Sequence, residues 1–312
     1  MKRVVVSEFM DLPAVESLRA SFEVDYAPDL VDDRAALLAR VAVADALIVR
    51  NRTRVDREVL AAAPRLRAVG RLGVGLDNID VAACEAAKVA VFPATGANSL
   101  PVAEYVLATA MVLLRGAYLS SDEVTAGRWP RARMSQGRET AGKTLGLVGF
   151  GGIGRLTAKL AQGLGMRVLA SDPMLRADSP VWAETGVGRR ELDQLLGEVD
   201  VLSLHVPLTD STRGLIDAAR IARMKPDAVL VNTARGGIVD EAALAAALRA
   251  GRLGGAALDV FADEPMPAGS PLADAPNLIL TPHIGGVTRE SNERVSALVA
   301  ARVREFLDAQ GA

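Results

Sequence analysis

Short runs of β-branched and other apolar residues recur along the chain, and a helical or loop segment follows each of them. The runs predicted as strands are Val4–Val6, Ala46–Val49, Leu66–Val69, Val89–Phe92, Thr144–Val148, Arg167–Ser171, Val201–His205, Ala228–Asn232, Ala256–Val260 and Leu278–Thr281. Strands that alternate with helices form parallel sheets covered by helices on both faces. The pattern therefore predicts an α/β protein, and this many strands fit two doubly wound parallel sheets better than one.

Two helical segments, one in the middle of the chain and one at its end, indicate how two domains divide. Residues 98–114 begin with a capping residue, Asn98 or Ser99, carry Pro101 in the first turn and contain no later helix breaker. Residues 288–310 place apolar side chains on one helical face, and we expect this helix to return to the first domain. The prediction is a discontinuous domain of residues 1–97 and 289–312, and a second domain of residues 98–288. The polar, arginine-rich stretch 120–142 is interpreted as a long loop or arm.

The composition is that of an ordinary globular protein. Of 312 residues, 50% are hydrophobic and 24% are charged, and the formal net charge is −2, whereas nucleic-acid binders normally carry a strongly basic domain. The single cysteine, Cys84, has no partner for an internal disulfide, which favours a reducing compartment. The apolar runs are too short for a signal peptide or for the roughly 20 residues of a membrane-spanning helix. We therefore expect a cytoplasmic protein with no metal site and no nucleic-acid or membrane partner.

A glycine-rich motif at residues 149–154 follows one predicted strand directly and precedes a helical pattern. Gly149 would permit a tight turn, Gly151 would let the backbone approach a pyrophosphate, and Gly154 would let the helix pack closely on the sheet. The helix N-terminus would offer N–H groups to the phosphates. Taken alone the motif is weak evidence, because glycine-rich turns also occur for structural reasons.

A carboxylate after the next predicted strand strengthens the prediction of a dinucleotide site. Asp172 lies 18 residues after Gly154, where it would accept hydrogen bonds from the ribose hydroxyls and repel a 2′-phosphate. NAD is therefore favoured over NADP, although nearby Arg176 could pair with such a phosphate. The simpler alternative is that Asp172 only stabilises the turn before Pro173.

The chain has two histidines, which narrows the search for a group that exchanges protons near neutral pH. His283 lies just past a predicted strand end, where open parallel sheets bind their ligands. His205 also follows a strand, but no charged residue is near it in the sequence, so we expect it to line the cofactor cleft. For either histidine alone, a structural imidazole is the simpler interpretation.

Two further strand ends carry groups that complement His283. Arg235 follows the strand that ends near Asn232, and Glu264 follows the strand that ends near Val260. Oxidation of an alcohol beside a carboxylate needs a cation for the carboxylate, a base for the hydroxyl proton and a nicotinamide to receive hydride. We predict that Arg235 pairs with the carboxylate, that His283 exchanges the proton, and that Glu264 orients the imidazole and favours its charged form.

The chain resembles the D-isomer-specific 2-hydroxyacid dehydrogenase family over essentially its whole length. The matching motifs are residues 70–80, 142–146, 149–154, 205–209, 232–237, 258–265 and 282–285. The resemblance implies a Rossmann-type cofactor domain inserted in a flavodoxin-like substrate domain, a homodimer, and the same Arg, Glu and His roles. It also implies that the backbone at Val74 and Gly75 helps to hold the substrate carboxylate. We further assign to the cofactor site these motif residues: Gly152, Ile153, His205, Pro207, Thr233, Asp259 and Gly285.

Within that family the motifs look closest to the phosphoglycerate dehydrogenase branch, with one departure that concerns the substrate. At Asn51 and Arg52 those enzymes typically carry a small hydroxyl residue and alanine. With Arg50, the extra cation and amide suggest that the substrate is a small 2-hydroxy or 2-oxo acid with a second anionic group. Residues 282–288 resemble the ending of sulfolactate dehydrogenases, so sulfolactate and 3-phosphoglycerate rank ahead of lactate, glyoxylate, hydroxypyruvate or a bulky keto acid. The alternative for Arg50 and Arg52 is a solvated loop.

Two other functions use the same fold. A corepressor-like protein that senses NAD(H) would be favoured by a disrupted catalytic set or by added partner-binding tails, and the sequence has neither. A formate dehydrogenase is disfavoured because formate oxidation needs no proton acceptor and those enzymes lack the acid that Glu264 supplies.

Overall fold

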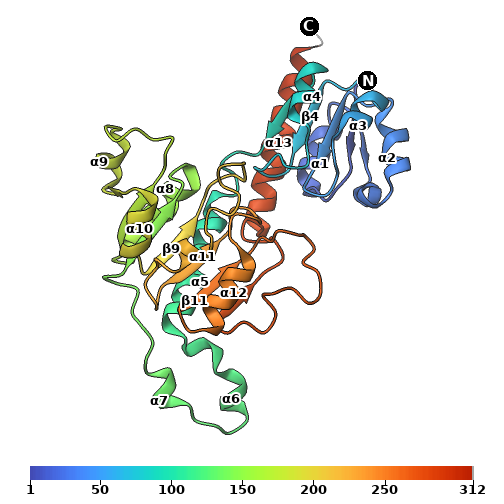
Figure 1. Cartoon of the computed structure of the whole chain (residues 1–312). Coiled ribbons are helices and arrows are strands. Elements are labelled where there is room, and N and C mark those ends of the chain that lie inside the picture. Colours follow the sequence, from blue (N-terminus) through green and yellow to red (C-terminus); the bar gives the residue numbers. More distant parts are fainter. Residues whose placement is uncertain (311–312) are drawn as a thin grey trace. The chain divides into compact units, whose positions relative to one another are not determined.

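The chain forms two α/β units, described over residues 1–310 by a computed structural model. One unit comprises Met1–Asn98 and Val287–Ala312, and the other comprises Ser99–Gly286. Each is built on one parallel sheet with helices on its faces (Figure 1). The predicted fold class, two doubly wound parallel-sheet domains, is confirmed.

The sheet of the first unit has the strand order β2-β1-β3-β4-β5, and every pairing is parallel. This is the flavodoxin-like order. Its strands are β1 (Arg3–Val6), β2 (Glu23–Tyr26), β3 (Ala46–Val49), β4 (Ala68–Arg71) and β5 (Ala90–Pro93). Because side chains alternate along a strand, Val4 and Val6 enter the core on one face and Val5 enters the core on the other. Burial on both faces explains the apolar runs Val4–Val6 in β1 and Ala46–Val49 in β3.

The helices of the first unit are α1 (Leu12–Arg19), η1 (Pro28–Asp32), α2 (Arg34–Val41), α3 (Arg57–Ala62), α4 (Val81–Ala86) and α13 (Arg289–Ala309). Local side chains cap α2, α3, α4 and α13 among them. Asp33, Asp56 and Asp80 accept N–H groups in the first turns of α2, α3 and α4. Thr288 and Ser291 form a capping box at the start of α13.

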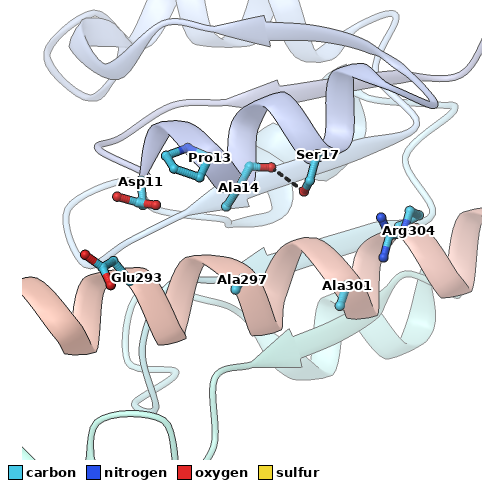
Figure 2. Close-up of a pocket in the computed structure, with 8 residues that line it drawn as sticks. All are labelled: Asp11, Pro13, Ala14, Ser17, Glu293, Ala297, Ala301 and Arg304. Carbon is cyan, nitrogen blue, oxygen red and sulfur yellow. Dashed lines mark hydrogen bonds between the residues drawn. The ribbon is translucent and has the colours of Figure 1, made fainter.

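The C-terminal helix α13 packs on β4 and on α1. A Cβ on Gly70 of β4 would lie only 2.6 Å from Val299 Cγ1, so this glycine permits the close approach of the helix. A groove of about 440 Å³ lies between α1 and α13. Figure 2 shows small side chains along it, with Asp11 and Glu293 at one end and Arg304 at the other. None of the predicted catalytic residues lines this groove.

The sheet of the second unit has the order β12-β11-β10-β9-β6-β7-β8, again all parallel. The strands are β6 (Thr144–Val148), β7 (Arg167–Ser171), β8 (Gly188–Arg189), β9 (Val201–Leu204), β10 (Val229–Asn232), β11 (Gly255–Leu258) and β12 (Leu278–Leu280). Within this sheet the chain first forms β6 and adds β7 and β8 on one side of it. It then returns and adds β9 to β12 on the other side. The switch point therefore lies between β6 and β9, where such sheets bind ligands beyond the strand ends.

Helices cover both faces of this second sheet and bury separate apolar cores. They are α5 (Ser99–Arg115), η2 (Ala117–Leu119), α6 (Ser121–Thr125), α7 (Arg131–Met134), α8 (Gly152–Gly163), α9 (Val181–Thr185), α10 (Leu192–Glu198), α11 (Ala218–Ile221) and α12 (Glu241–Arg249). The stretch expected as a long loop or arm contains two short helices, α6 and α7, on a segment that extends away from the end of α5 (Figure 1).

Two strands were not predicted. The edge strand β2 reads Glu-Val-Asp-Tyr and is mostly half-buried, so it lacks the continuous apolar run that marks a central strand. The other, β8, has two residues and cannot produce a periodic signal. Within residues 1–310, no helix is long and apolar enough to cross a membrane.

Candidate active site

The residues predicted to be catalytic lie in the loops that follow three neighbouring strands of the second sheet. Arg235 follows β10, Glu264 follows β11 and His283 follows β12, and these strands are adjacent and parallel. Their carboxyl ends therefore lie along one edge of the sheet. The loops after β10 and β11 also touch, because a Cβ on Gly236 would stand only 1.6 Å from the Phe261 carbonyl oxygen.

The imidazole of His283 contacts the carboxylate of Glu264 directly. His283 Nδ1 lies 2.7 Å from Glu264 Oε2, and the side chains are 40% and 34% exposed. The other carboxylate oxygen, Oε1, accepts the backbone N–H of Phe261 at 3.0 Å. When the Nδ1 proton is held by the carboxylate, Nε2 is the ring nitrogen that carries the lone pair.

The backbone around His283 is held by a buried acid. His283 has a left-handed conformation, with φ of 56°, which is uncommon for a residue other than glycine. Asp259, which is 2% exposed, accepts the N–H of Ile284 through Oδ1 at 2.8 Å and that of Gly285 through Oδ2 at 2.7 Å. A Cβ at Gly285 would lie 2.9 Å from Asp259 Oδ2, so glycine permits this approach. Asp259 was predicted to belong to the cofactor site. In the structure its carboxylate contacts the backbone of the loop that carries His283.

The turn that carries Arg235 is held by Asn232, which is 1% exposed. The Asn232 amide donates to the carbonyl of Arg235 at 2.9 Å and accepts the N–H of Ala234 at 3.0 Å. Arg235 Nη1 donates to the Ala234 carbonyl at 2.6 Å. Sequence reasoning did not single out Asn232, although a polar residue closing a buried strand directly before the arginine was an available signal.

The four glycines of the motif differ in what surrounds them. Gly149 has φ of 93°, and a Cβ there would stand 2.7 Å from the carbonyl oxygen of His205. A Cβ on Gly154 would stand 2.5 Å from the carbonyl oxygen of Gly149, so Gly154 is required by the turn itself. By contrast, apart from the adjoining backbone, no described atom lies within 4 Å of a Cβ placed on Gly151 or Gly152. Open space at these two positions, at the start of α8, leaves room for a phosphate.

Asp172 follows β7 and holds two backbone segments together. Its Oδ2 accepts the N–H of Phe150 in the glycine turn at 2.7 Å, and its Oδ1 accepts the N–H of Met174 at 2.9 Å. The second bond is the turn stabilisation considered as the alternative, and it exists alongside the contact with the glycine motif. Arg176 is exposed and pairs with Asp178 through two bonds of 2.9 Å.

His205 lies after β9, beside the glycine turn. Its N–H donates to the Val148 carbonyl at 2.7 Å, and its Nε2 lies 3.0 Å from Ser203 Oγ. Desolvation lowers the pKa of His205 to about 4, so the ring is neutral at physiological pH. Pro207 is exposed on the same loop. A neutral imidazole beside the glycine turn is compatible with the role predicted for His205 next to the cofactor.

One buried hydroxyl indicates that this edge of the sheet accommodates a ligand. Thr233 Oγ1 is buried and has no hydrogen-bond partner within residues 1–310, whereas buried polar atoms are normally bonded. It lies between the loops of Arg235 and His283, with its Cγ2 only 3.5 Å from a Cβ placed on Gly285. Together with the open glycines and Asp172, it fits a dinucleotide along the strand ends.

The residues predicted to select the substrate lie in the first unit, after β3 and β4. Glu8 is 4% exposed and organises the first of these loops, because it accepts the N–H groups of Arg50, Arg52 and Thr53 at 2.7, 3.2 and 2.9 Å. Asn78, from the second loop, donates its amide to the Thr53 carbonyl at 2.7 Å. These long-range contacts were not predicted.

The two arginines of that loop have different environments. Arg50 Nη2 donates to Asn292 Oδ1 at 2.8 Å, and its guanidinium lies 5.8 Å from the centre of the Phe9 ring. Burial lowers the pKa of Arg50 below its ordinary value, which leaves it fully charged. Arg52 is exposed and pairs with Asp32 on the surface.

The remaining predicted residues of this region are more accessible than the buried Glu8. Asn51 is exposed, while Val74 and Gly75 are half-buried in the loop after β4. A backbone pairing between Val55 and the segment around Ile79 ties this loop to the one after β3.

Comparison with known proteins places these motifs in a family. The model described as D-isomer specific 2-hydroxyacid dehydrogenase, NAD binding domain, matches residues 107–285. The chain belongs to the D-isomer specific 2-hydroxyacid dehydrogenase family. It is an oxidoreductase with the family's NAD-binding domain, so the predicted reaction class and cofactor are confirmed.

Relatives within the family differ in the substrate that they are named for. The (S)-sulfolactate dehydrogenase of Chromohalobacter salexigens is 57% identical over 98% of this chain and 99% of its own length. The D-3-phosphoglycerate dehydrogenase of Mycobacterium tuberculosis is 45% identical over 87% of this chain, which corresponds to 51% of that enzyme. The chain thus spans about half the length of this phosphoglycerate enzyme.

A solved structure shares the fold. The D-lactate dehydrogenase of Aquifex aeolicus, determined with NAD and lactic acid, has a TM-score of 0.86 at 29% identity, covering 99% of this chain and 96% of that one. The family and the fold are therefore established by independent comparisons.

Proposed function

We propose that this protein is an NAD-dependent (S)-sulfolactate dehydrogenase, with 3-phosphoglycerate as the second candidate substrate. The observation that carries the reaction is the 2.7 Å contact between His283 and Glu264 on a strand end beside that of Arg235. Support for sulfolactate comes from the similarity to the Chromohalobacter enzyme over both full lengths. D-Lactate, glyoxylate and hydroxypyruvate rank lower because they lack a second anionic group.

The stereochemistry of sulfolactate is compatible with a D-specific family. Sulfur gives the sulfomethyl group of sulfolactate priority over the carboxylate, whereas in lactate the carboxylate outranks the methyl group. The label (S) in sulfolactate therefore describes the same spatial arrangement as D-lactate. A D-specific site would accept (S)-sulfolactate and D-3-phosphoglycerate in one orientation.

The catalytic roles follow from the chemistry of each side chain. Arg235 would pair with the substrate carboxylate through two parallel hydrogen bonds. His283 Nε2 would take the hydroxyl proton during oxidation and return it during reduction. Glu264 acts as a positioning residue, because it holds Nδ1 and stabilises the imidazolium that forms. When bound, NAD supplies the hydride acceptor for C2.

The cofactor would be held along the strand ends of the second sheet. The N–H groups at residues 151–154 suit the pyrophosphate, and Asp172 suits the ribose hydroxyls. Thr233 Oγ1, buried and without a partner among the described residues, would find one in the cofactor. His205, Pro207 and Gly285 line the same edge.

The second anion of the substrate would be bound by the loop after β3, chiefly by Arg50. Its guanidinium is held in place by Asn292 and Phe9, so little side-chain entropy is lost when a sulfonate binds. Arg52 is paired with Asp32 and would contribute less. Asn51 would add an amide donor, and the backbone at Val74 and Gly75 would help to hold the carboxylate.

We also propose that the chain functions as a homodimer through α5 and the segment that follows it. Leu100 and Met111 of α5 are 42% and 40% exposed, and Tyr118 and Trp129 on the extended segment are 67% and 77% exposed. Exposed apolar residues in continuous elements are typical of a protein interface. Equilibrium sedimentation should give twice the chain mass, and Trp129→Ser should shift the equilibrium toward monomer. A monomeric wild-type protein would contradict this part of the proposal.

The substrate assignment is tested by initial rates of NAD reduction. The panel should contain both sulfolactate enantiomers, D-3-phosphoglycerate, D-glycerate and D-lactate under one set of conditions. We expect the highest kcat/KM for (S)-sulfolactate and, for D-lactate, a value lower by on the order of 10²-fold, the contribution of one charge-assisted contact. Equal values for D-lactate and (S)-sulfolactate would overturn the role of a second anion site, and higher values for 3-phosphoglycerate would select the second candidate.

A further inference from the structure

A chain of hydrogen bonds runs from helix α5 to the loop that carries His283. The Tyr105 hydroxyl lies 2.7 Å from Thr281 Oγ1, which in turn donates to Asp259 Oδ1 over 2.6 Å. Asp259 also accepts the backbone N–H groups of residues 284–285 at 2.8 and 2.7 Å. A side chain of α5 is thereby linked to both peptide groups that directly follow His283.

The protons in this chain have one consistent direction. The Thr281 hydroxyl has a single proton and gives it to the Asp259 carboxylate, so the Tyr105 hydroxyl must donate to Thr281. Burial raises the pKa of Tyr105, against a smaller opposing effect of the Thr281 hydrogen bond. Tyr105 therefore stays protonated, and remains a donor, at physiological pH.

The hydrogen-bond chain ends at a backbone segment with an unfavourable conformation. His283 has φ of 56°, a left-handed conformation that is unfavourable for a residue with a Cβ and persists only where its surroundings hold it. The buried Asp259 carboxylate provides that support through residues 284–285, and it needs all of its donors because unpaired buried charges are costly. Hydrogen bonds in series also polarise one another, so loss of one weakens the next.

We propose that Tyr105 is a positioning residue for His283, acting through Thr281 and Asp259 to fix the loop on which the imidazole stands. The inference rests on the proposed role of His283 as the proton-exchanging group. By this inference, α5, a helix on the face of the sheet, helps to position the loop of His283 at the strand ends. Tyr105 does not touch the imidazole, so its effect depends on the two intermediates.

The test compares two variants that each remove one tyrosine hydroxyl, Tyr105→Phe and Tyr26→Phe. Tyr105→Phe should lower kcat by about tenfold, because small displacements of a catalytic group are costly, and should leave KM for NAD within about twofold. The acid limb of the oxidation pH profile should also move, since His283 is held less firmly against Glu264. Tyr26→Phe is the matched control, because the Tyr26 hydroxyl bonds to the Met10 backbone in the first unit, and the kinetics of this variant should equal those of wild type.

Coupling between the residues is tested by a double-mutant cycle. Thr281→Val should lower kcat at least as much as Tyr105→Phe, and the double variant should be no worse than Thr281→Val alone. Thr281→Ser keeps the hydroxyl and should restore activity to within about twofold of wild type. NADH binding, followed by fluorescence, confirms that each variant is folded.

Two results would overturn the inference: unchanged kcat and pH profile in Tyr105→Phe, or additive losses in the double variant. Measurement of His283→Ala in the same series separates this from the proposed function. If His283→Ala keeps its activity, the role of His283 is wrong. If His283→Ala is inactive while Tyr105→Phe matches wild type, only the positioning role of Tyr105 is wrong.

Discussion

His283 Nδ1 and Glu264 Oε2 lie 2.7 Å apart although 19 residues separate them in the chain. The contact arises because β11 and β12 are adjacent and parallel, so the loops after them leave the sheet at the same edge. The Phe261 N–H holds the other oxygen of the carboxylate at 3.0 Å, which leaves Oε2 directed at the imidazole. In the proposed mechanism this contact orients the imidazole and leaves Nε2 as the ring nitrogen for the substrate.

Replacing Glu264 with Gln should change the pH dependence of catalysis. The amide cannot accept from both the Phe261 N–H and the His283 ring, and it cannot stabilise the imidazolium. Oxidation requires the neutral ring, so the acid limb of its pH–rate profile should move to lower pH, while kcat falls by on the order of 10²-fold. Stopped-flow rates between pH 5 and 10 would check this, with Glu241→Gln, whose carboxylate accepts the Ala262 N–H, as control. An unshifted acid limb would reject this role for Glu264.

The three residues predicted to be catalytic show which part of their arrangement is encoded locally. Arg235, Glu264 and His283 each follow an apolar run that reads as a strand, and parallel strands bring their carboxyl ends together. Their arrangement at one edge therefore follows from short-range patterns. The arrangement of the glycine motif before α8 follows in the same way, because strand, turn and helix are contiguous in the sequence.

The contacts that orient these residues are not local, and they were not predicted. Glu8 accepts N–H groups 42–45 residues away, and Asp259 reaches the loop of His283 from the preceding strand end. A lone acid after an apolar strand has no sequence signal that names its partners. The left-handed conformation of His283 was equally hidden, because it depends on support from Asp259.

Arg50 and Arg52 should differ in their effect on substrate choice. Arg50 is held by Asn292 and lies over Phe9, whereas Arg52 is engaged by Asp32. Arg50→Ala should raise KM for (S)-sulfolactate and 3-phosphoglycerate by about 10–100-fold, the value of a charge-assisted hydrogen bond, and change KM for D-lactate by less than about threefold. Arg52→Ala should have a small effect on all three, because exposed ion pairs contribute little. If Arg50→Ala affects all three substrates equally, this loop does not bind a second anion.

His205 should make the folded state sensitive to mild acid. Its pKa is lowered from 6.5 to about 4 by desolvation, so between these values the unfolded chain binds a proton that the folded chain does not. Stability therefore falls as the pH drops from 6.5 toward 4, and this group contributes about 2 kcal/mol of loss between pH 7 and pH 5. In His205→Gln the loss over that interval should be smaller by about this amount, measured by urea unfolding. Identical pH dependence in both proteins would contradict the prediction.

Gly151 and Gly154 should separate cofactor binding from folding. Apart from the adjoining backbone, a Cβ on Gly151 meets no described atom within 4 Å, and its φ of −76° suits alanine, so Gly151→Ala should cost no more than about 1 kcal/mol of stability. Its methyl group would stand where a phosphate approaches α8, and NADH affinity should fall at least about tenfold.

In Gly154→Ala the new Cβ would stand 2.5 Å from the carbonyl oxygen of Gly149. The turn and α8 must move apart, which should lower the free energy of unfolding by about 1–3 kcal/mol. Calorimetric titration with NADH and urea unfolding distinguish the two effects. The assignment of residues 151–154 to the pyrophosphate would be wrong if Gly151→Ala bound NADH as tightly as the unmodified chain, because the space at that position would then serve no ligand.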